Sequence, residues 1–217
     1  MIQARHIHKS FDDLKVVKDV SLELQKAEIL SIVGSSGAGK STLLQILGTL
    51  SQADQGELII ADTTIHKLNA KELAAFRNEQ LGFVFQFHHL LPEFSAIENV
   101  CFPAWIKGKS KKESLKMASE LLEILSLSDR IDHKPMELSG GEQQRVAVAR
   151  ALINQPSVVF ADEPSGNLDS ENAKALHELF FNLRDQFKQS FVIVTHNKEL
   201  AQMSDRILEM KNGEIVR

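Results

Sequence analysis

The residues best suited to chemistry form a glycine-rich run that ends in a lysine and a hydroxyl side chain. The run reads Gly34-Ser35-Ser36-Gly37-Ala38-Gly39-Lys40-Ser41, follows an apolar segment and precedes a helical pattern. This is the context of a phosphate-binding loop, in which curled backbone N–H groups and a helix N-terminus face phosphate oxygens. We expect Lys40 to reach the β- and γ-phosphates of a nucleotide, Ser41 to ligate Mg²⁺, and Thr42 to complete the site. A glycine-rich turn with a chance lysine is the alternative, which the agreement of strand, spacing and helix disfavours.

Two adjacent carboxylates at the end of an apolar run supply what a phosphate loop lacks. The loop alone does not distinguish hydrolysis from phosphoryl transfer to a small molecule. Asp162 and Glu163 follow the apolar residues 158–161. We expect Asp162 to hold Mg²⁺ through a water and Glu163 to polarise the attacking water. Neighbouring residues on a strand point to opposite faces, so two roles are natural. A solvated acidic turn before Pro164 is the alternative, which the apolar strand disfavours.

The elements that must position these residues alternate between short apolar runs and helical patterns, which predicts an α/β domain. Continuously apolar runs such as residues 191–194 suit central parallel strands, and the early and late runs suit antiparallel ones. A polar helical pattern from Ser95 to Leu127 predicts an insertion, so we expect one domain, 1–217, with a helical subdomain at about residues 90–152. The expected strands are Val16–Leu24, Glu28–Val33, Glu57–Ala61, Leu81–Phe85, Ser157–Ala161, Phe191–Val194 and Arg206–Met210, with a helix from Lys40 to about Leu50 and a turn at Lys211–Glu214.

Composition narrows the function classes. The net charge of −4 gives no basic field, so we expect no nucleic-acid partner. The only cysteine, Cys101, lies among apolar residues and is interpreted as a buried, unreactive thiol in a reducing compartment. No run approaches the ~20 apolar residues of a membrane-spanning helix, and the first residues lack the apolar stretch of a secretion signal. We therefore expect a cytosolic chain that needs another polypeptide if it serves a membrane.

The segment Leu138-Ser139-Gly140-Gly141-Glu142-Gln143-Gln144-Arg145 makes the chain resemble the ATP-binding cassette (ABC) ATPases. The resemblance implies a P-loop NTPase fold with a mixed sheet core, an antiparallel β subdomain and a helical subdomain. It also implies that Ser139, Gly140, Gly141 and Glu142 bind the γ-phosphate of ATP held by an opposite subunit, so that the chain works as a homodimer around ATP. A kinase for a small substrate has no use for such a segment and is disfavoured.

Further residues match the family in sequence order. Gln86 matches the Q-loop glutamine, a metal and catalytic contact, and His196 matches the switch histidine, also catalytic along with Lys40 and Glu163. Residues 165–169 match the D-loop. Phe11 stands where the family places an aromatic side chain that stacks on adenine, and phenylalanine can stack. The alternative for Phe11 is a core residue of the first strand.

The stretch after Gln86 resembles one group within the family, the bacterial lipoprotein-releasing ATPases. It reads FQFHHLLPEF at residues 85–94. Macrolide-exporter and cell-division ATPases, the second acting as a nucleotide-dependent scaffold, remain alternatives because they share the motif at Pro164–Asp169. The resemblance implies that the Phe87–Phe94 region receives integral membrane permease subunits at the cytoplasmic face of the inner membrane, where the chain would be peripheral. We expect Phe87, Leu90, Leu91 and Phe94 to be divided between this groove and anchoring of the helical subdomain; the paired histidines do not suit a metal.

Overall fold

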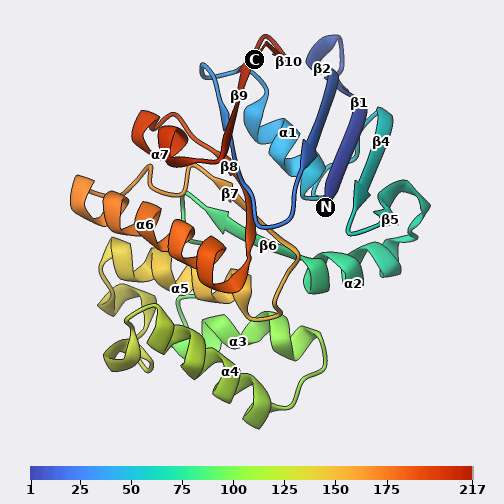
Figure 1. Cartoon of the computed structure of the whole chain (residues 1–217). Helices are drawn as coiled ribbons and strands as arrows, with labels where there is room; N and C mark the ends of the chain where they lie inside the picture. The colour runs from blue at the N-terminus through green and yellow to red at the C-terminus, as the bar shows by residue number, and fades with distance from the viewer. Residues whose placement is uncertain (217) are drawn as a thin grey trace.

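The computed structural model describes residues 1–216 and contains two sheets flanked by helices (Figure 1). Arg217 lies outside the described residues. The strands are β1 (Ile2–Phe11), β2 (Leu14–Leu24), β3 (Ile29–Val33), β4 (Gln55–Ile60), β5 (Thr63–Thr64), β6 (Leu81–Phe85), β7 (Val158–Asp162), β8 (Ser190–Val194), β9 (Arg206–Lys211) and β10 (Glu214–Ile215). The helices are α1 (Lys40–Leu47), α2 (Ala70–Gln80), α3 (Ala96–Ile106), α4 (Lys111–Ile124), α5 (Gly140–Leu152), α6 (Ser170–Phe187) and α7 (Lys198–Met203), with short 3₁₀ turns at Ile65–Lys67, Ser128–Arg130 and Pro135–Glu137.

The central sheet is mixed and has the order β10-β9-β3-β8-β7-β6. Strands β9, β3, β8, β7 and β6 run parallel, and only the β9–β10 pair is antiparallel. The second sheet, β2-β1-β4-β5, is antiparallel throughout. The expected α/β class with a mixed core and an antiparallel subdomain is therefore confirmed. Because the carboxyl ends of β3, β7 and β8 meet at one edge, the loops that follow these strands come together.

The two faces of the central sheet pack in different cores. On β8, Phe191 and Ile193 pack with the helical cluster of α3, α4, α5 and α6, whereas Val192 and Val194 pack with α1 and the antiparallel sheet. This follows from the two-residue period of a strand. Figure 1 shows α3 and α4 at the end of the molecule opposite to the antiparallel sheet. The inserted helical segment thus shares a core with one face of the sheet, and Cys101 is buried in it, as expected.

Several elements differ from the expected set. Strand β1 precedes the first strand named above, and α2 falls in a region for which no element was expected. Helix α1 ends at Leu47 rather than near residue 50, because Gly48 caps it and its N–H bonds back to the carbonyl of Leu44. The expected insertion consists of α3 and α4, joined by a short turn at residues 107–110.

Candidate functional site

The glycine-rich run forms a tight loop between β3 and α1, as the sequence predicts. A side chain at Gly34 (φ 150°) would place its Cβ 2.1 Å from the Met210 carbonyl oxygen, and one at Gly39 (φ 98°) would lie 2.5 Å from the Val16 carbonyl oxygen. Both positions therefore require glycine. Gly37 (φ 77°) faces open space, and Ser35 and Ser36 are exposed beside it. The loop is thus pressed against the two sheets on one side and open on the other, while Ala38 is buried.

The open side of the loop presents unpaired donors. Within residues 1–216, the backbone N–H groups of Gly37, Gly39, Lys40 and Ser41 have no partner in the chain. Lys40 Nζ donates to the carbonyls of Gly34 (2.9 Å) and Ser35 (3.0 Å), which holds the ammonium over the loop. Helix α1 has no acidic residue in its first turn, where Thr42 lies, and no side chain caps it. A helix N-terminus with free donors and a lysine suits a triphosphate.

Asp162 and Ser41 meet at the start of α1. Ser41 Oγ donates to Asp162 Oδ1 at 3.1 Å. Burial raises the pKa of the Asp162 carboxyl, an effect that the Ser41 hydrogen bond and nearby Lys40 oppose and nearby Glu163 reinforces. One hydroxyl and one carboxylate are hard oxygen ligands that suit Mg²⁺. Ser41 and Asp162 together offer two such ligands, and in the described part of the chain no group of three or more acidic, histidine or cysteine side chains could hold a metal ion.

Glu163 leaves the strand and turns to His196. Its backbone is left-handed (φ 46°), and its N–H donates to the Val194 carbonyl at 2.9 Å on neighbouring β8. Its Oε2 accepts from the His196 N–H at 3.1 Å and lies 2.8 Å from His196 Nδ1. The two carboxylates therefore diverge because the chain bends after Asp162, and the expected reason, alternation along a strand, is wrong. The geometry thus places the Asp162 carboxylate beside Ser41, which suits a metal, and the Glu163 carboxylate beside His196.

Gln86 does not reach Ser41 or Asp162 in this structure. Its Nε2 donates to Asn167 Oδ1 at 2.9 Å, and Asn167 Nδ2 donates to the Gln86 carbonyl at 3.2 Å. The segment that holds Asn167 is fixed at its other end, where Ser165 Oγ lies 3.1 Å from Nε2 of buried His177. Burial lowers the pKa of His177. Sequence reasoning missed Asn167 as a partner of the Q-loop, although it lies within the recognised motif at residues 164–169.

The Ser139 segment begins α5 in a capping box. Ser139 Oγ accepts from the Glu142 N–H at 3.3 Å, and Glu142 Oε2 accepts from the Ser139 N–H at 2.7 Å. Gly140 is exposed, whereas Gly141 is buried, and a Cβ on Gly141 would lie 2.3 Å from Asn172 Oδ1. The Glu142 carboxylate, expected to bind nucleotide, also accepts from Arg130 Nε at 2.9 Å. It is thus engaged within its own chain.

The Ser139 segment and the Lys40 loop remain separate within one chain. No hydrogen bond joins them in residues 1–216, and they belong to different cores, α1 with the antiparallel sheet and α5 with α3 and α4. Each presents its own helix N-terminus. One chain therefore does not bring together all the residues predicted to bind a single nucleotide.

Phe11 ends β1 with an exposed side chain. Its exposed fraction is 51%, so the alternative that it is a core residue is wrong. Lys9 Nζ lies 5.4 Å from the ring centroid, a cation–π distance. Stacking of this half-exposed ring on adenine stays a prediction.

The stretch after Gln86 is divided as expected. Phe87 is 67% exposed and Leu91 is 41% exposed, whereas Leu90 packs against the helical core. The Phe94 ring packs edge-on against Phe102 at 4.8 Å. Arg150 on α5 fixes the turn between these residues by donating to the carbonyls of His88 (2.7 Å) and His89 (2.6 Å).

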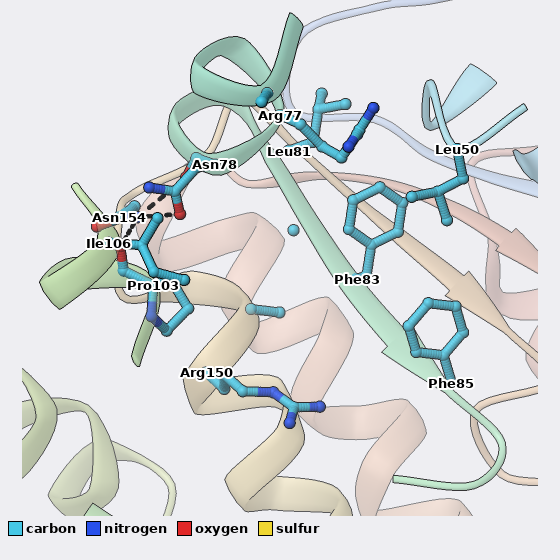
Figure 2. A pocket seen from close by; sticks show the side chains of 13 residues that line it. Leu50, Arg77, Asn78, Leu81, Phe83, Phe85, Pro103, Ile106, Arg150 and Asn154 are labelled. Atoms are coloured by element: carbon cyan, nitrogen blue, oxygen red, sulfur yellow. Dashed lines mark hydrogen bonds between the residues drawn. The ribbon is translucent and has the colours of Figure 1, made fainter. Parts of the chain in front are cut away.

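A mostly apolar cavity opens between β6 and the helices beside this turn (Figure 2). Its volume is about 440 Å³, and its lining includes Leu50, Phe83, Phe85, Ile106 and Arg150. In Figure 2 the two phenylalanine rings and Leu50 lie on one side of the cavity, and Pro103 and Ile106 lie on the other. The cavity thus lies between β6 and the helices α2, α3 and α5.

These features define a cassette with a triphosphate-type loop, a metal-type carboxylate and a second anion-type helix N-terminus. A model of the ABC transporter family matches residues 17–166. The chain belongs to the ABC transporter family, and the expected class, an ATP-binding cassette that hydrolyses ATP, is confirmed. Among residues 1–216 no helix is both long and apolar enough to cross a membrane.

Two curated relatives and two solved structures place the chain more closely. It is 58% identical over 215 residues to the lipoprotein-releasing system ATP-binding protein LolD of Bacteroides thetaiotaomicron, with 99% of each chain covered. It is also 58% identical over 213 residues to LolD of Porphyromonas gingivalis, covering 98% of this chain and 97% of the relative. A dimeric structure of MJ0796, a bacterial ABC transporter cassette, has a TM-score of 0.91 at 38% identity, covering 100% of this chain and 97% of that one. A dimeric post-hydrolysis state of MJ0796 bound to ADP and Pi has a TM-score of 0.90 at 37% identity, with the same coverage of both chains. The expected similarity to the lipoprotein-releasing ATPases is thus confirmed.

Proposed function

We propose that the chain hydrolyses Mg·ATP as a homodimer at the cytoplasmic face of the bacterial inner membrane, where it drives permease subunits that release lipoproteins. The observation that carries the proposal is the separation of two anion-type helix N-termini, α1 behind the Lys40 loop and α5 behind Ser139, in different cores. A twofold axis would bring α1 of one copy against α5 of the other, and so complete two identical sites. The dimers of MJ0796 support this arrangement.

The residues of the site would have distinct roles in hydrolysis. Lys40 would neutralise charge on the transferring phosphoryl group, and Glu163 would orient and deprotonate the attacking water. His196 would hold the Glu163 carboxylate, to which it already donates, and the γ-phosphate. Mg²⁺ bound by Ser41 and Asp162 would supply further neutralisation of phosphate charge. Gln86 would exchange its bond to Asn167 for contact with the metal and water, which links nucleotide binding to the residue 164–169 segment.

The membrane partner would dock on the exposed part of the Phe87–Phe94 region. Phe87 and Leu91 present apolar side chains to solvent before and after the turn that Arg150 holds, and Arg150 also lines the cavity of Figure 2. An amphipathic helix that places apolar side chains into such a groove is a common recognition mode. The names of the relatives that match the chain over nearly its full length support lipoprotein release as the work that is driven.

The first test is a pair of variants that separates ATP binding from assembly. We expect Glu163→Gln to lower turnover by ~10²–10⁴-fold, as loss of a general base does, while a dimer accumulates with ATP. We expect Ser139→Arg in the Glu163→Gln background to bind ATP but to remain a monomer, because Ser139 would act on the partner's nucleotide. Light scattering gives the mass, and a fluorescent ATP analogue gives binding. If the monomeric double variant fails to bind ATP, then Ser139 belongs to the nucleotide site of its own chain, which contradicts the proposal.

A further inference from the structure

Helix α5 carries a negative charge where it would receive an anion. Helix α1 has no acidic residue in its first turn, but α5 has Glu142. Hydrogen bonding from the Ser139 backbone, aided by the Ser139 hydroxyl and by Arg130, lowers the pKa of Glu142. The carboxylate is therefore ionised at neutral pH. A carboxylate favours a helix N-terminus but repels a phosphate that approaches the same end.

Arg130 forms an ion pair with the Glu142 carboxylate. Its Nε donates to Glu142 Oε1 at 2.9 Å, while Glu142 Oε2 accepts from the Ser139 N–H at 2.7 Å. The carboxylate is thus held between the guanidinium and the helix end, with its side chain 19% exposed. The Ser139 hydroxyl accepts from the Glu142 N–H at 3.3 Å and lies at the exposed start of the helix. The exposed Gly140 lies next to it with no side chain in the way.

The magnitude of the repulsion makes Arg130 matter. Two unit charges about 7 Å apart change an equilibrium by about threefold in a water-like dielectric and by about fiftyfold at the effective dielectric of a protein surface. Because Arg130 is 43% exposed, part of its own effect is screened by solvent. A paired carboxylate is nearly neutral toward a phosphate, whereas an unpaired one adds the full repulsion at each of two sites.

We propose that Arg130 is a positioning residue that neutralises and orients Glu142, so that the N-terminus of α5 can accept the γ-phosphate bound by a second copy of this chain. The inference rests on the proposed function, since it requires the nucleotide to be shared between two copies. Arg130 acts through Glu142 and needs no contact with ATP. Substitution of Arg130 should therefore weaken ATP-dependent dimerisation only while Glu142 carries a charge.

A double-mutant cycle in the Glu163→Gln background tests this role. The readout is the ATP concentration at half-maximal dimerisation, followed by light scattering with Mg²⁺ in excess. We expect Arg130→Ala to raise this concentration about three- to fiftyfold. Adding Glu142→Gln should return it to within about twofold of the parent, because the amide oxygen can still accept from the Ser139 N–H. Glu142→Gln by itself should dimerise at ATP concentrations no higher than those of the parent.

Lys116→Ala is the matched control for the loss of one positive charge. Lys116 pairs with Glu120, at 3.9 Å, on the exposed face of α4, so its variant should dimerise as the parent does. The Arg130→Ala defect should also shrink when salt is raised from about 0.1 M to about 0.5 M. Should Arg130→Ala unfold, Arg130→Gln, which keeps a polar side chain, replaces it in the cycle.

The outcomes separate the two proposals. If the Glu163→Gln parent never dimerises with ATP, the proposed function fails first. If the parent dimerises but Arg130→Ala has no effect, only the role of Arg130 is overturned. A defect that persists after Glu142→Gln also overturns it, since Arg130 would then act by direct contact or by folding the loop before α5.

Discussion

Asp162 is placed where its ionised form is costly to the folded protein. Its carboxyl is mostly enclosed, and burial raises its pKa despite the hydrogen bond from Ser41. For an acid whose folded pKa is raised, the unfolded chain loses its proton first as pH rises. As pH rises from the pKa of this carboxyl in the unfolded chain to its pKa in the folded chain, stability is therefore lost. At neutral pH the ionised group destabilises the ligand-free fold. Active-site charges commonly carry such a cost.

The first prediction at this scale concerns Asp162→Asn. We expect a higher Tm for the ligand-free variant at pH 7, because the amide carries no charge and its oxygen can still accept from Ser41. Mg²⁺-dependent ATP hydrolysis should fall by ~10²-fold or more, because the metal-type carboxylate is gone. Calorimetry and phosphate release measure the two effects. A lower Tm at pH 7, with no gain relative to the wild type, would contradict the pKa argument.

Sequence spacing predicts which residues lie at the site better than it predicts how their side chains point. Lys40, Ser41 and Asp162 meet as expected because a strand, a loop and a helix start determine their places. Gln86 and Glu142 instead turn to Asn167 and Arg130, and no local pattern names those partners. Side-chain orientation depends on residues brought close only by the fold, so these two contacts could not be predicted from the chain.

At the scale of elements, α5 links the region proposed for the membrane partner to the segment that begins with Ser139. Arg150 near its C-terminal end holds the carbonyls of His88 and His89, where the backbone at His89 is left-handed (φ 49°). Arg150 lies eleven positions after Ser139 along α5, a rise of about 16 Å. Because α5 is a rigid helix, it would transmit a displacement of the turn at residues 88–89 to its own N-terminal end.

The prediction for this element concerns Arg150. We expect Arg150→Ala to lower the free energy of unfolding by about 1.5–3 kcal/mol, the usual cost of lost hydrogen bonds to a charged group. Amide exchange at residues 87–91 should become faster. Arg150→Lys keeps the charge but not the forked geometry. Its free energy of unfolding and its exchange rate should therefore lie between those of the wild type and those of Arg150→Ala. Urea denaturation and hydrogen exchange measure these effects, and unchanged exchange in Arg150→Ala would show that the turn is fixed by other contacts.

The elements that the hydrophobic pattern of the sequence predicts are those with a regularly repeating apolar face. Strands β3, β7 and β8 are buried along nearly their full length and were predicted within a residue or two. Helix α2 contains no fully buried residue, Phe76 packs only partly buried against the core, and the helix is marked mainly by its Asn69 capping box. Strand β1 breaks its alternation at His6, where the backbone is left-handed and the register shifts. Strand β1 does bury Ile2, Ala4 and Ile7, but the irregular spacing of these residues hides the strand from a two-residue pattern.

At the scale of the whole molecule, the two cores give the chain two lobes that share the central sheet. The Lys40 loop belongs to one and the Ser139 segment to the other, so a nucleotide shared between copies would join unlike lobes. A ligand that binds only the folded state stabilises it by RT ln(1 + [L]/Kd), about 2.7 kcal/mol at a hundredfold excess over Kd. If that ligand also joins two chains, the gain depends on protein concentration.

The last prediction uses this dependence. In Glu163→Gln with saturating Mg·ATP, we expect Tm to rise by about 5–11 °C, taking about 2–4 °C per kcal/mol for a chain of this size. The rise should grow with protein concentration. With Mg·ADP the shift should be independent of concentration, because ADP lacks the γ-phosphate that α5 of the second copy would bind. EDTA should reduce both shifts, because without the metal the Asp162 carboxylate would face the phosphate charge directly. Scanning calorimetry over a hundredfold range of protein concentration separates the cases: a concentration-independent shift with ATP means that the nucleotide is held within one chain.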